Sequence, residues 1–280
     1  MITRLAPAKL NLFLHILNRD INGYHCIQTL FQLIDYCDEL QFRLRNDGVI
    51  NCHCIPVTPF CDLSSLHTDN IIITAAKLLQ TRMKISLGVE ICVKKRIPLG
   101  AGLGGGSSNA ATTLRALNTL WKLHLPDAEL LNLATQLGAD VPVFFQACTA
   151  WAEGYGEQLQ TVQLPRAWFV VLVPPVTVAT QKIFSHPELT RNTTAITIAA
   201  FFSGSVKVRN DCEPLVRRIY PIVDEAFHWF EHYVPTRLTG TGACLFAQFK
   251  SKKEANIMLK RFIASPYRGF LAKGLNCAPQ

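Results

Sequence analysis

The most informative part of the chain reads Pro98-Leu99-Gly100-Ala101-Gly102-Leu103-Gly104-Gly105-Gly106-Ser107-Ser108, with five glycines within seven residues. Glycine adopts positive φ freely and lets backbone N–H groups crowd around an anion. An apolar helical period continues through Leu114 to Trp121, and the start of such a helix adds partial positive charge. The two serines could cap the helix, or reach a phosphate or its magnesium ion. The pattern favours a phosphate-binding loop over a flexible turn with an N-cap.

Three common nucleotide-binding motifs do not fit this loop. Gly100, Gly102 and Gly105 satisfy G-x-G-x-x-G, but a dinucleotide site also needs an acidic residue about 20 positions later, and the residues around position 120 are Leu, Trp and Lys. A P-loop needs G-K-[ST], and no lysine follows these glycines. The catalytic and metal-binding signatures of protein kinases are also absent. The loop therefore belongs to a different class of phosphate site.

Composition indicates a globular protein, and its basic charge does not point to a nucleic-acid partner. The chain has 280 residues, of which 49% are apolar and 17% charged, so a sizeable core is expected. Its formal net charge of +8 has two open explanations: solvated surface, or a polyanionic small substrate. The tightest basic cluster is Lys94 to Arg96, and basic and aromatic residues do not gather as in an RNA-binding protein. No nucleic-acid partner is expected.

The ten cysteines favour reduced thiols in a cytoplasm, because no secretory signal pattern precedes them and Lys9 interrupts the first apolar stretch. Cys52, His53 and Cys54 have C-x-C spacing with no partner pair, so zinc is not expected. No apolar run reaches the roughly 20 residues that span a bilayer. The best one, Ala167 to Ala179, is broken by two prolines, so no membrane partner is expected.

Hydrophobic patterning predicts an α+β protein of two lobes. The division is expected after residue 152, giving domains 1–152 and 153–280. Asn22-Gly23 predicts a tight turn, and the stretch 46–67 has no clear assignment. The expected strands are 10–17, 28–35, 39–45, 89–93, 168–173 and 244–249. The expected helices are 70–81, the one that follows the glycine loop, 126–138, 214–230 and 252–263.

Four segments in order along the chain resemble the motifs of the superfamily of galactokinase, homoserine kinase, mevalonate kinase and phosphomevalonate kinase. The glycine loop with Asn109-Ala110-Ala111 resembles the superfamily's P-x-x-x-G-L-G-S-S-A-type loop. The other three segments are Ala6-Pro7-Ala8-Lys9-Leu10-Asn11-Leu12, Leu137-Gly138-Ala139-Asp140-Val141-Pro142 and Leu238-Thr239-Gly240-Thr241-Gly242-Ala243. Together the motifs are highly specific, and the resemblance covers nearly the whole chain.

The resemblance implies an N-terminal lobe like ribosomal protein S5 and a ferredoxin-like C-terminal lobe, with the active site in the cleft between them. Asn22-Gly23-Tyr24-His25 narrows it to the member family that acts on cytidine diphosphate-linked methylerythritol. The implied activity is ATP-dependent phosphorylation of the 2-hydroxyl of that substrate in non-mevalonate isoprenoid precursor synthesis. Two alternatives remain open: a mevalonate or homoserine kinase of the same superfamily, and a catalytically inactive nucleotide-binding homologue.

The matched motifs imply two catalytic residues, Asp140 as the base and Lys9 facing it. Taken alone, Asp140 reads as an N-cap before Val141-Pro142, and Lys9 as a lysine on the wet face of a strand. Asn11 shares the strand face of Lys9 and would bind substrate or orient Asp140. Magnesium is expected with ATP, but its protein ligand is not identified: Ser107, Ser108 or water alone could serve. The oligomeric state is expected to be monomer or homodimer.

The resemblance also implies the ligand-binding residues. Tyr24 and Phe184 would stack on cytosine, and His25 would bond its polar edge; the alternatives are ordinary turn residues and core packing. The loop Thr239, Gly240, Thr241 and Gly242 would close on the substrate diphosphate, or is a tight turn. The expected ATP-binding residues are Asn70, Lys95, Pro98, Leu99, Gly100, Ala101, Gly102, Leu103, Gly104, Gly105, Gly106, Ser107 and Ser108.

Overall fold

A computed structural model describes residues 1–21, 23–61 and 70–279 and shows an α+β protein. The strands of the described part form one mixed sheet with the order β3-β4-β2-β10-β7-β9-β8, to which β1, β5 and β6 are attached. The strands are β1 (Ile2–Arg19), β2 (His25–Arg45), β3 (Ile50–Pro56), β4 (Gly88–Lys95), β5 (Ala150–Glu153), β6 (Gln158–Thr161), β7 (Trp168–Val173), β8 (Arg237–Leu238), β9 (Leu245–Phe249) and β10 (Arg268–Leu275).

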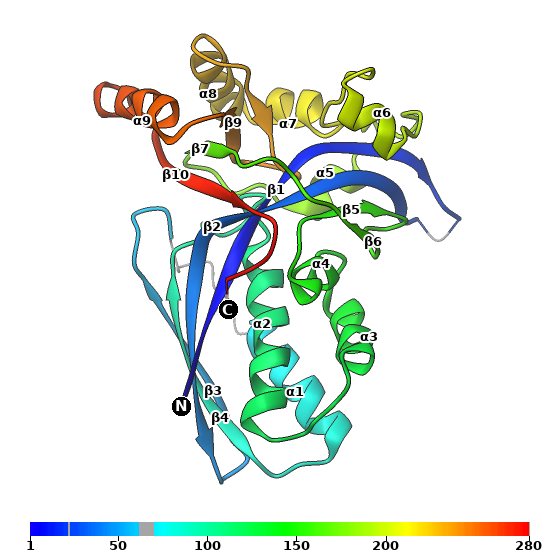
Figure 1. Cartoon of the computed structure of the whole chain (residues 1–280), viewed down its shortest axis with the longest axis vertical. Coiled ribbons are helices and arrows are strands. Elements are labelled where there is room, and N and C mark those ends of the chain that lie inside the picture. The colour runs from blue at the N-terminus through cyan, green and yellow to red at the C-terminus, as the bar shows by residue number, and fades with distance from the viewer. Residues whose placement is uncertain (22, 62–69, 280) are drawn as a thin grey trace.

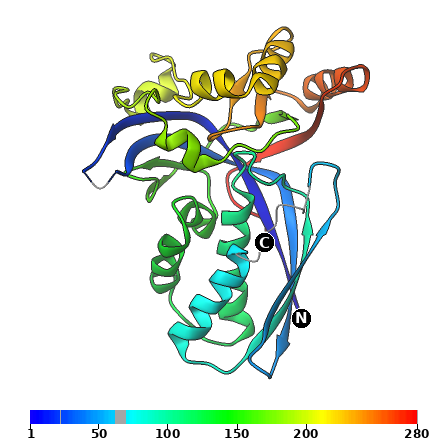
Figure 2. The same ribbon diagram turned by 180° about the vertical axis from the view of Figure 1, so that it is seen from behind.

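The helices form two groups (Figure 1). In the lower half of that view the first four helices pack beside β1 to β4, and the later helices lie with β7, β9 and β10 in the upper half; Figure 2 shows the same division from behind. The helices are α1 (Ile71–Met83), α2 (Gly105–Leu120), α3 (Asp127–Leu137), α4 (Val141–Gln146), α5 (Thr180–Ser185), α6 (Ile198–Ser203), α7 (Glu213–Ile219), α8 (Pro221–Glu231) and α9 (Lys252–Lys260), followed by a 3₁₀ turn, Arg261–Ala264.

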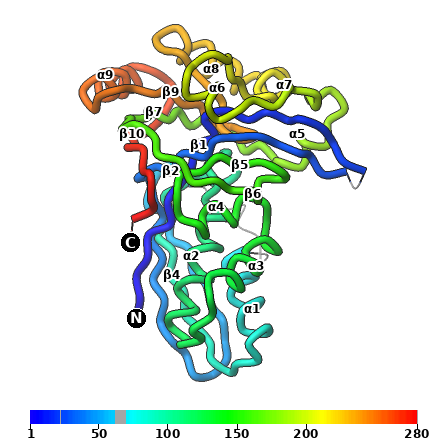
Figure 3. The backbone as a smooth tube through the Cα atoms, turned by 45° about the vertical axis from the view of Figure 1, so that its right-hand side comes forward, coloured from blue at the N-terminus to red at the C-terminus, as the bar shows by residue number. Residues whose placement is uncertain are grey.

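The strands β1 and β2 form a long antiparallel hairpin that runs through both halves of the molecule (Figure 3). Its paired residues extend from Ile2 opposite Phe42 to Arg19 opposite His25. Strand β10 pairs with β2 on one side and with β7 on the other, so it joins the two halves of the sheet. The hairpin thus carries the side chains of β1 from one half of the fold into the other.

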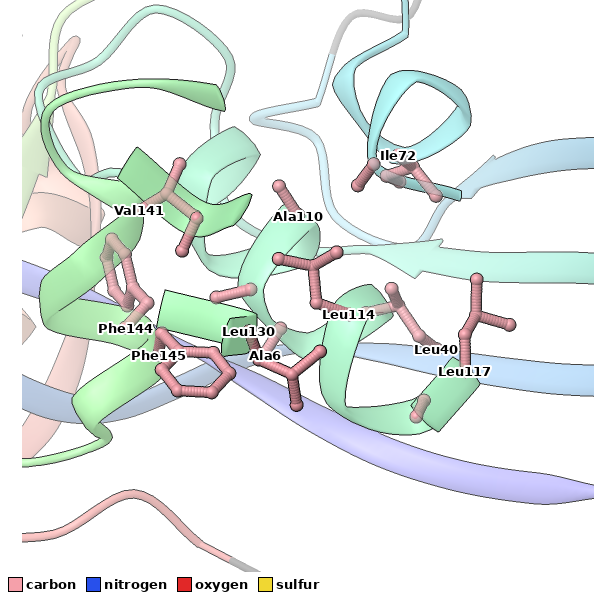
Figure 4. Close-up of a cluster of buried hydrophobic side chains, with 14 of the residues drawn as sticks. Ala6, Leu40, Ile72, Ala110, Leu114, Leu117, Leu130, Val141, Phe144 and Phe145 are labelled. Carbon is pink, nitrogen blue, oxygen red and sulfur yellow. The ribbon is translucent and has the colours of Figure 1, made fainter. Parts of the chain in front are cut away.

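Buried apolar side chains form three clusters that follow this layout. The first fills the space between the sheet and α1 to α4 (Figure 4). The second lies under the later helices and includes Leu14, Ile16 and Ile27 from the hairpin tip. The third joins β1 and β2 to β7, β9 and β10, with Phe13 and Phe246 among its members. The third cluster therefore bridges the two halves of the fold.

Most expected elements are confirmed, with corrected bounds. The two expected strands 28–35 and 39–45 are one strand, β2. The strand continues through the buried Asp38, because Lys95, Arg96 and Ile97 donate hydrogen bonds to its carboxylate. The stretch 46–67 contains β3, an edge strand with little apolar pattern, and its residues 62–67 lie outside the described part, as does Asn22. The prediction of a single helix over 214–230 was wrong, because Pro221 divides this stretch into α7 and α8.

Three further findings concern the topology. The parallel pairing of β3 with β4 across α1 forms a βαβ unit that was not expected from the sequence. Strands β5, β6, β8 and β10 and helices α5 and α6 were also not anticipated, because each is short or half-buried. Within the described residues, no helix combines the length and hydrophobicity that a bilayer crossing requires.

Candidate active site

A cavity of about 880 Å³ is lined by the glycine loop, β1, the hairpin turn, the residues before α4, helix α5 and the loop after β8. Many of the predicted residues line it: Lys9, Asn11, Tyr24, His25, Pro98, Leu99, Gly100, Ala101, Gly102, Gly104, Gly105, Gly106, Ser107, Asp140, Phe184, Gly240 and Thr241. The described lining does not include Asn70, Lys95, Leu103, Ser108, Thr239 or Gly242. Segments far apart in sequence therefore meet around one space.

The glycine loop connects β4 to the start of α2 (Figure 1). Gly104 is the N-cap of α2 with φ 71°, and no side chain caps the helix. The first-turn N–H groups, from Gly105 to Ser107, are therefore left for a ligand, and all three residues line the cavity. Such an uncapped helix start favours an anion.

Four glycines of the loop, Gly100, Gly102, Gly104 and Gly105, have no room for a side chain, and two of them show this well. Gly102 has φ 76°, and a Cβ there would lie 2.1 Å from the carbonyl oxygen of Thr239. Gly104 has φ 71°, and a Cβ there would lie 2.6 Å from the ring of Phe144. Gly106 differs, because among the described residues its Cβ would meet only the Ile71 side chain, at 3.7 Å. The loop backbone is thus fixed by close contacts at some glycines and open at others.

Lys9 lies in the middle of β1 with its side chain buried. Its ammonium group donates to the carbonyl oxygen of Gly102 at 2.9 Å and to Oδ1 of Asn11 at 2.5 Å. Burial lowers the pKa of Lys9, while the neighbouring Asp140 carboxylate raises it. The wet-face interpretation of Lys9 was wrong: its charge is held inside the site, where it contacts the glycine loop.

Asp140 immediately precedes α4, at the N-cap position, but its side chain makes no capping hydrogen bond. Instead Oδ2 lies 3.5 Å from Nζ of Lys9. The aspartate side chain is 36% exposed and lines the cavity, whereas that of the lysine is 3% exposed. The carboxylate is thus accessible to a ligand on one side and faces a cation on the other.

The loop after β8 packs directly on the glycine loop. The hydroxyl of Thr239 donates to the carbonyl oxygen of Gly102 at 3.2 Å and accepts from the backbone N–H of Asn11 at 3.0 Å. The hydroxyls of Thr241 and Thr180 lie 3.0 Å apart, which connects this loop to α5. Asn11 also donates to the Thr29 hydroxyl at 2.9 Å. Hydrogen bonds therefore hold Asn11 of β1 to β2 through Thr29 and to the loop after β8 through Thr239.

Aromatic side chains line the end of the cavity near the hairpin turn. Tyr24 is 65% exposed, and its ring lies 5.6 Å from that of Tyr155, whose hydroxyl donates to Asp20 at 2.6 Å. The ring of His25 lies 5.2 Å from that of Phe184. Tyr24 and Phe184 therefore each belong to an aromatic pair at this end of the cavity, and the partner of Phe184 is the imidazole of His25.

Lys95 and Asn70 are held away from the described cavity by other partners. The ammonium group of Lys95 is buried and donates to Oδ2 of Asp38, whose Oδ1 accepts from the backbone N–H groups of Arg96 and Ile97. Asn70 is the N-cap of α1, and its side chain accepts from Ile72 N at 3.0 Å. Lys95 nevertheless lies beneath the loop, because a Cβ on Gly105 would be 3.0 Å from its Nζ.

The start of α2 also offers oxygen atoms for a metal ion. Ser107 lines the cavity, and Oγ of Ser108 is buried without a hydrogen-bond partner among the described residues. Within 1–21, 23–61 and 70–279, no group of three His, Cys, Asp or Glu side chains could hold a metal. A divalent ion accompanied by ATP fits this donor set, because Mg²⁺ keeps several waters and takes few protein ligands.

Sequence reasoning missed Tyr155, Arg191 and Asp38. Tyr155 stands between two glycines, Gly154 and Gly156, a pattern that marks an exposed turn and could have indicated it. Arg191 contacts His25 from a segment without regular structure, and no local pattern points to that contact. Asp38 lies inside a strand, where a buried carboxylate is not expected without its partner.

Two family models match the chain: GHMP kinases N terminal domain over residues 70–147, and GHMP kinases C terminal over residues 195–268. Together with the glycine loop and the cavity, these matches define the class of the protein as an ATP-dependent small-molecule kinase of the GHMP type. The crystal structure of a mevalonate kinase shares the fold, with a TM-score of 0.70 and 15% identity over 99% of this chain and 100% of that one.

Relatives of nearly full length narrow the class. The chain is 47% identical to the 4-diphosphocytidyl-2-C-methyl-D-erythritol kinase of Nitrosococcus oceani over 97% of this chain and 94% of that protein. It is 48% identical to that of Alkalilimnicola ehrlichii over 98% and 91%. A crystal structure of 4-(cytidine 5'-diphospho)-2C-methyl-D-erythritol kinase matches with a TM-score of 0.78 and 29% identity over 98% and 99%. The chain belongs to the 4-diphosphocytidyl-2-C-methyl-D-erythritol kinase family.

Proposed function

We propose that this protein transfers the γ-phosphoryl group of ATP to the 2-hydroxyl of 4-diphosphocytidyl-2-C-methyl-D-erythritol, in non-mevalonate isoprenoid precursor synthesis. One observation carries the proposal: a single cavity is lined by an uncapped, glycine-rich helix start, by the Lys9–Asp140 pair and by two aromatic pairs. These are the parts needed to hold a nucleoside triphosphate, to activate a hydroxyl and to stack a base.

In this proposal Asp140 is the general base. Its carboxylate accepts the proton of the 2-hydroxyl while the oxygen bonds to the γ-phosphorus and the bond to the β-phosphate oxygen breaks, leaving ADP. Lys9 faces the carboxylate with a positive charge and balances the charge that moves to the transferred group. The hydrogen bonds from Lys9 to Gly102 and Asn11 support this role, because they hold the ammonium group at a fixed position.

The glycine loop binds the ATP phosphates in this proposal. The N–H groups from Gly105 to Ser107 would surround the anion, and Ser107 or Ser108 would reach the bound magnesium ion, which supplies charge neutralisation of the β- and γ-phosphates. Lys95 and Asn70 remain proposed contributors to the adenine end. Because Lys95 contacts Asp38 and Asn70 contacts Ile72, the simpler role for both is an indirect one, through the shape of the loop.

We propose a division into a ribosomal-protein-S5-like domain, 1–152, and a ferredoxin-like domain, 153–280, with the cavity as the cleft between them. The first buried cluster draws its core from residues before 153, and the family models divide between 147 and 195, which supports this boundary. The hairpin tip is the exception, since Leu14, Ile16 and Ile27 pack in the second cluster. We also propose a cytoplasmic location, which suits the ten free thiols.

The alternative substrates lack a base that could bind at the aromatic end of this cavity. Mevalonate and homoserine have no base, so they leave Tyr24, Tyr155, His25 and Phe184 without a function. A catalytically inactive homologue would have no use for a buried lysine beside a carboxylate. The first observation favours the cytidine-linked substrate, and the second favours an active kinase.

The test is a comparison of acceptors. The purified protein, ATP and magnesium are incubated with the cytidine-linked methylerythritol, with mevalonate and with homoserine. ADP release and the phosphorus spectrum of the product are then measured. We expect turnover with the cytidine compound alone, and a new phosphomonoester on its 2-hydroxyl. Faster turnover of mevalonate or homoserine would refute the proposal.

A further inference from the structure

The side chain of Arg191 is completely engaged in hydrogen bonds beside the cavity. Four of its five N–H groups are directed at backbone carbonyl oxygens: Nη1 donates to Pro187 and Leu189 at 3.2 and 3.1 Å, and Nη2 to Phe184 and His186 at 3.0 and 2.6 Å. The fifth, on Nε, donates to Nε2 of His25 at 2.8 Å. The guanidinium group therefore has no spare donor, and His25 is its one side-chain partner among the described residues.

This contact determines where His25 carries its proton. A guanidinium group in a protein does not lose its proton, so Nε of Arg191 is always a donor. Nε2 of His25 must then be the acceptor, and a neutral imidazole that accepts at Nε2 carries its hydrogen on Nδ1. Burial lowers the pKa of His25, and the charges of Arg191 and Arg19 lower it further, while Asp20 raises it. The neutral Nδ1–H form is the one that this surrounding stabilises.

Nδ1 is the ring atom left for a ligand. His25 lines the cavity next to Tyr24, and its ring lies 5.2 Å from that of Phe184. Within the described parts of the chain, no hydrogen bond uses its Nδ1. The imidazole therefore presents one N–H donor and no acceptor to a base that is bound between these aromatic side chains.

A single donor distinguishes the two pyrimidines. Cytosine has an unprotonated acceptor at ring N3, whereas uracil has an N–H there. A donor facing N3 bonds to cytosine but confronts uracil with another donor, which leaves two polar groups unpaired. Stacking on the aromatic rings makes no such distinction, because every base has a π-face.

We propose that Arg191 is a specificity-determining positioning residue, which fixes His25 as the Nδ1–H tautomer so that the site selects cytosine over uracil. This inference rests on the proposed function, since it assumes that the base binds beside His25. Arg191 acts through His25 and through the 184–189 backbone, and it contacts neither the acceptor hydroxyl nor the ATP phosphates in the proposed arrangement.

The first test uses the wild-type protein without substrate. Nitrogen-15 spectra of the histidine rings, with His25 assigned by its loss in His25→Gln, report which nitrogen carries the proton. We expect the neutral Nδ1–H form at pH 7. An Nε2–H tautomer, or an imidazolium at that pH, would overturn the proposal. This measurement does not depend on any activity, so it remains decisive if the proposed substrate is wrong.

The second test compares kcat/KM for cytidine- and uridine-diphosphate-linked methylerythritol. In Arg191→Gln the amide can either donate or accept, so the cytidine preference should fall roughly tenfold or more. Arg191→Lys keeps a charged donor and should retain much more of the preference. Arg218→Gln is the matched control, since it removes an exposed partner of Glu188 in the same segment and should leave the preference unchanged.

The outcomes separate the two ideas. A folded Arg191→Gln variant that loses affinity for both substrates equally shows a merely structural arginine and overturns the inference, as does an equal loss of preference in Arg218→Gln. A wild-type protein that does not phosphorylate the cytidine compound refutes the proposed function instead, and the tautomer spectrum then decides the role of Arg191. The inference about Arg191 is supported if the cytidine preference falls in Arg191→Gln, stays unchanged in Arg218→Gln, and the Nδ1–H signal of His25 is lost in Arg191→Gln.

Discussion

The ammonium nitrogen of Lys9 lies 3.5 Å from Oδ2 of Asp140, although the two residues are on β1 and just before α4. The lysine is buried and bonded to the glycine loop, and the aspartate is partly open to the cavity. A cation that is fixed on the protein side of a carboxylate leaves the other side of that carboxylate for a substrate hydroxyl. This arrangement makes Asp140 the first residue to test.

Asp140→Asn should lower kcat by about 10²–10⁴, the usual effect of losing a general base, with little change in ATP affinity. Asparagine has the same shape, and the side chain makes no capping bond that would be lost. Steady-state kinetics and titration calorimetry with ATP are the measurements. Asp127→Asn is the control, because that carboxylate is 72% exposed at the start of α3. Equal activity in the two variants would exclude Asp140 as the base.

Gly106→Val should weaken ATP binding roughly tenfold or more, with smaller changes in fold stability and in affinity for the cytidine substrate. Within the described part of the chain the Cβ meets only Ile71, at 3.7 Å, but the added methyl groups lie where the helix start faces the cavity. Titration calorimetry with each ligand and urea unfolding are the measurements. An equal loss for both ligands would mean that this glycine does not face phosphate.

Gly102→Ala should instead destabilise the fold by at least about 1–3 kcal/mol, because alanine at φ 76° is strained. Its Cβ would also lie 2.1 Å from the carbonyl oxygen of Thr239. Urea unfolding followed by fluorescence gives the free energy of unfolding. Gly204→Ala is the control, since that glycine has φ 69° but, apart from its chain neighbours, no described residue within 4 Å of its Cβ position. A loss no larger than that of Gly204→Ala would show that the contact with Thr239 is not tight.

Tyr24→Ala and Phe184→Ala should each lower affinity for the cytidine substrate by about 1–3 kcal/mol, the range of base–aromatic stacking, with ATP affinity unchanged. Both side chains line the cavity near the hairpin turn. Calorimetry measures both ligands, and Phe202→Ala, at an exposed site, is the control. Unchanged substrate affinity in both variants would reopen the case for a substrate without a base.

Lys95→Met should destabilise the fold by about 3–5 kcal/mol, because it leaves the buried carboxylate of Asp38 without its cation. Adding Asp38→Asn should recover most of that loss, since the amide oxygen can still accept from Arg96 and Ile97. Chemical unfolding of the single and double variants measures this. A Lys95→Met protein with unchanged stability but weaker ATP binding would favour direct contact with adenine.

The parts of the site that a sequence can predict are those built from consecutive residues. Gly100 to Ser108 predicts its own turn and the helix start after it, because positive φ and helix capping are local properties. The contact between Lys9 and Asp140 joins residues that are far apart in the sequence. Taken alone, the two residues indicated a surface lysine and a helix cap, and it was the motif resemblance that predicted their pairing. The structure brings the two side chains together because β1 and α4 both pack against α2.

The misses have the same origin. Asp38 interrupts the apolar pattern of β2, and its role depends on Lys95 and two backbone N–H groups more than 55 residues away. The contact of Arg191 with His25 joins residues 166 positions apart. Strand β10 has an unremarkable pattern of its own, and its place in the sheet is fixed by its partners, β2 and β7. Patterns along the chain carry no information on such partners.

The central position of β10 has a consequence for the order in which the protein acquires its structure. Among the described strands, β10 is the link between β2 and the β7-β9-β8 group. A nascent chain that has emerged only as far as residue 267 therefore has two separate pieces of sheet, each with an unpaired edge where β10 will insert. Exposed edges of this kind pair readily with other chains. Synthesis of residues 268–275 completes the sheet, so these two edges stay open to other chains until that stretch is released.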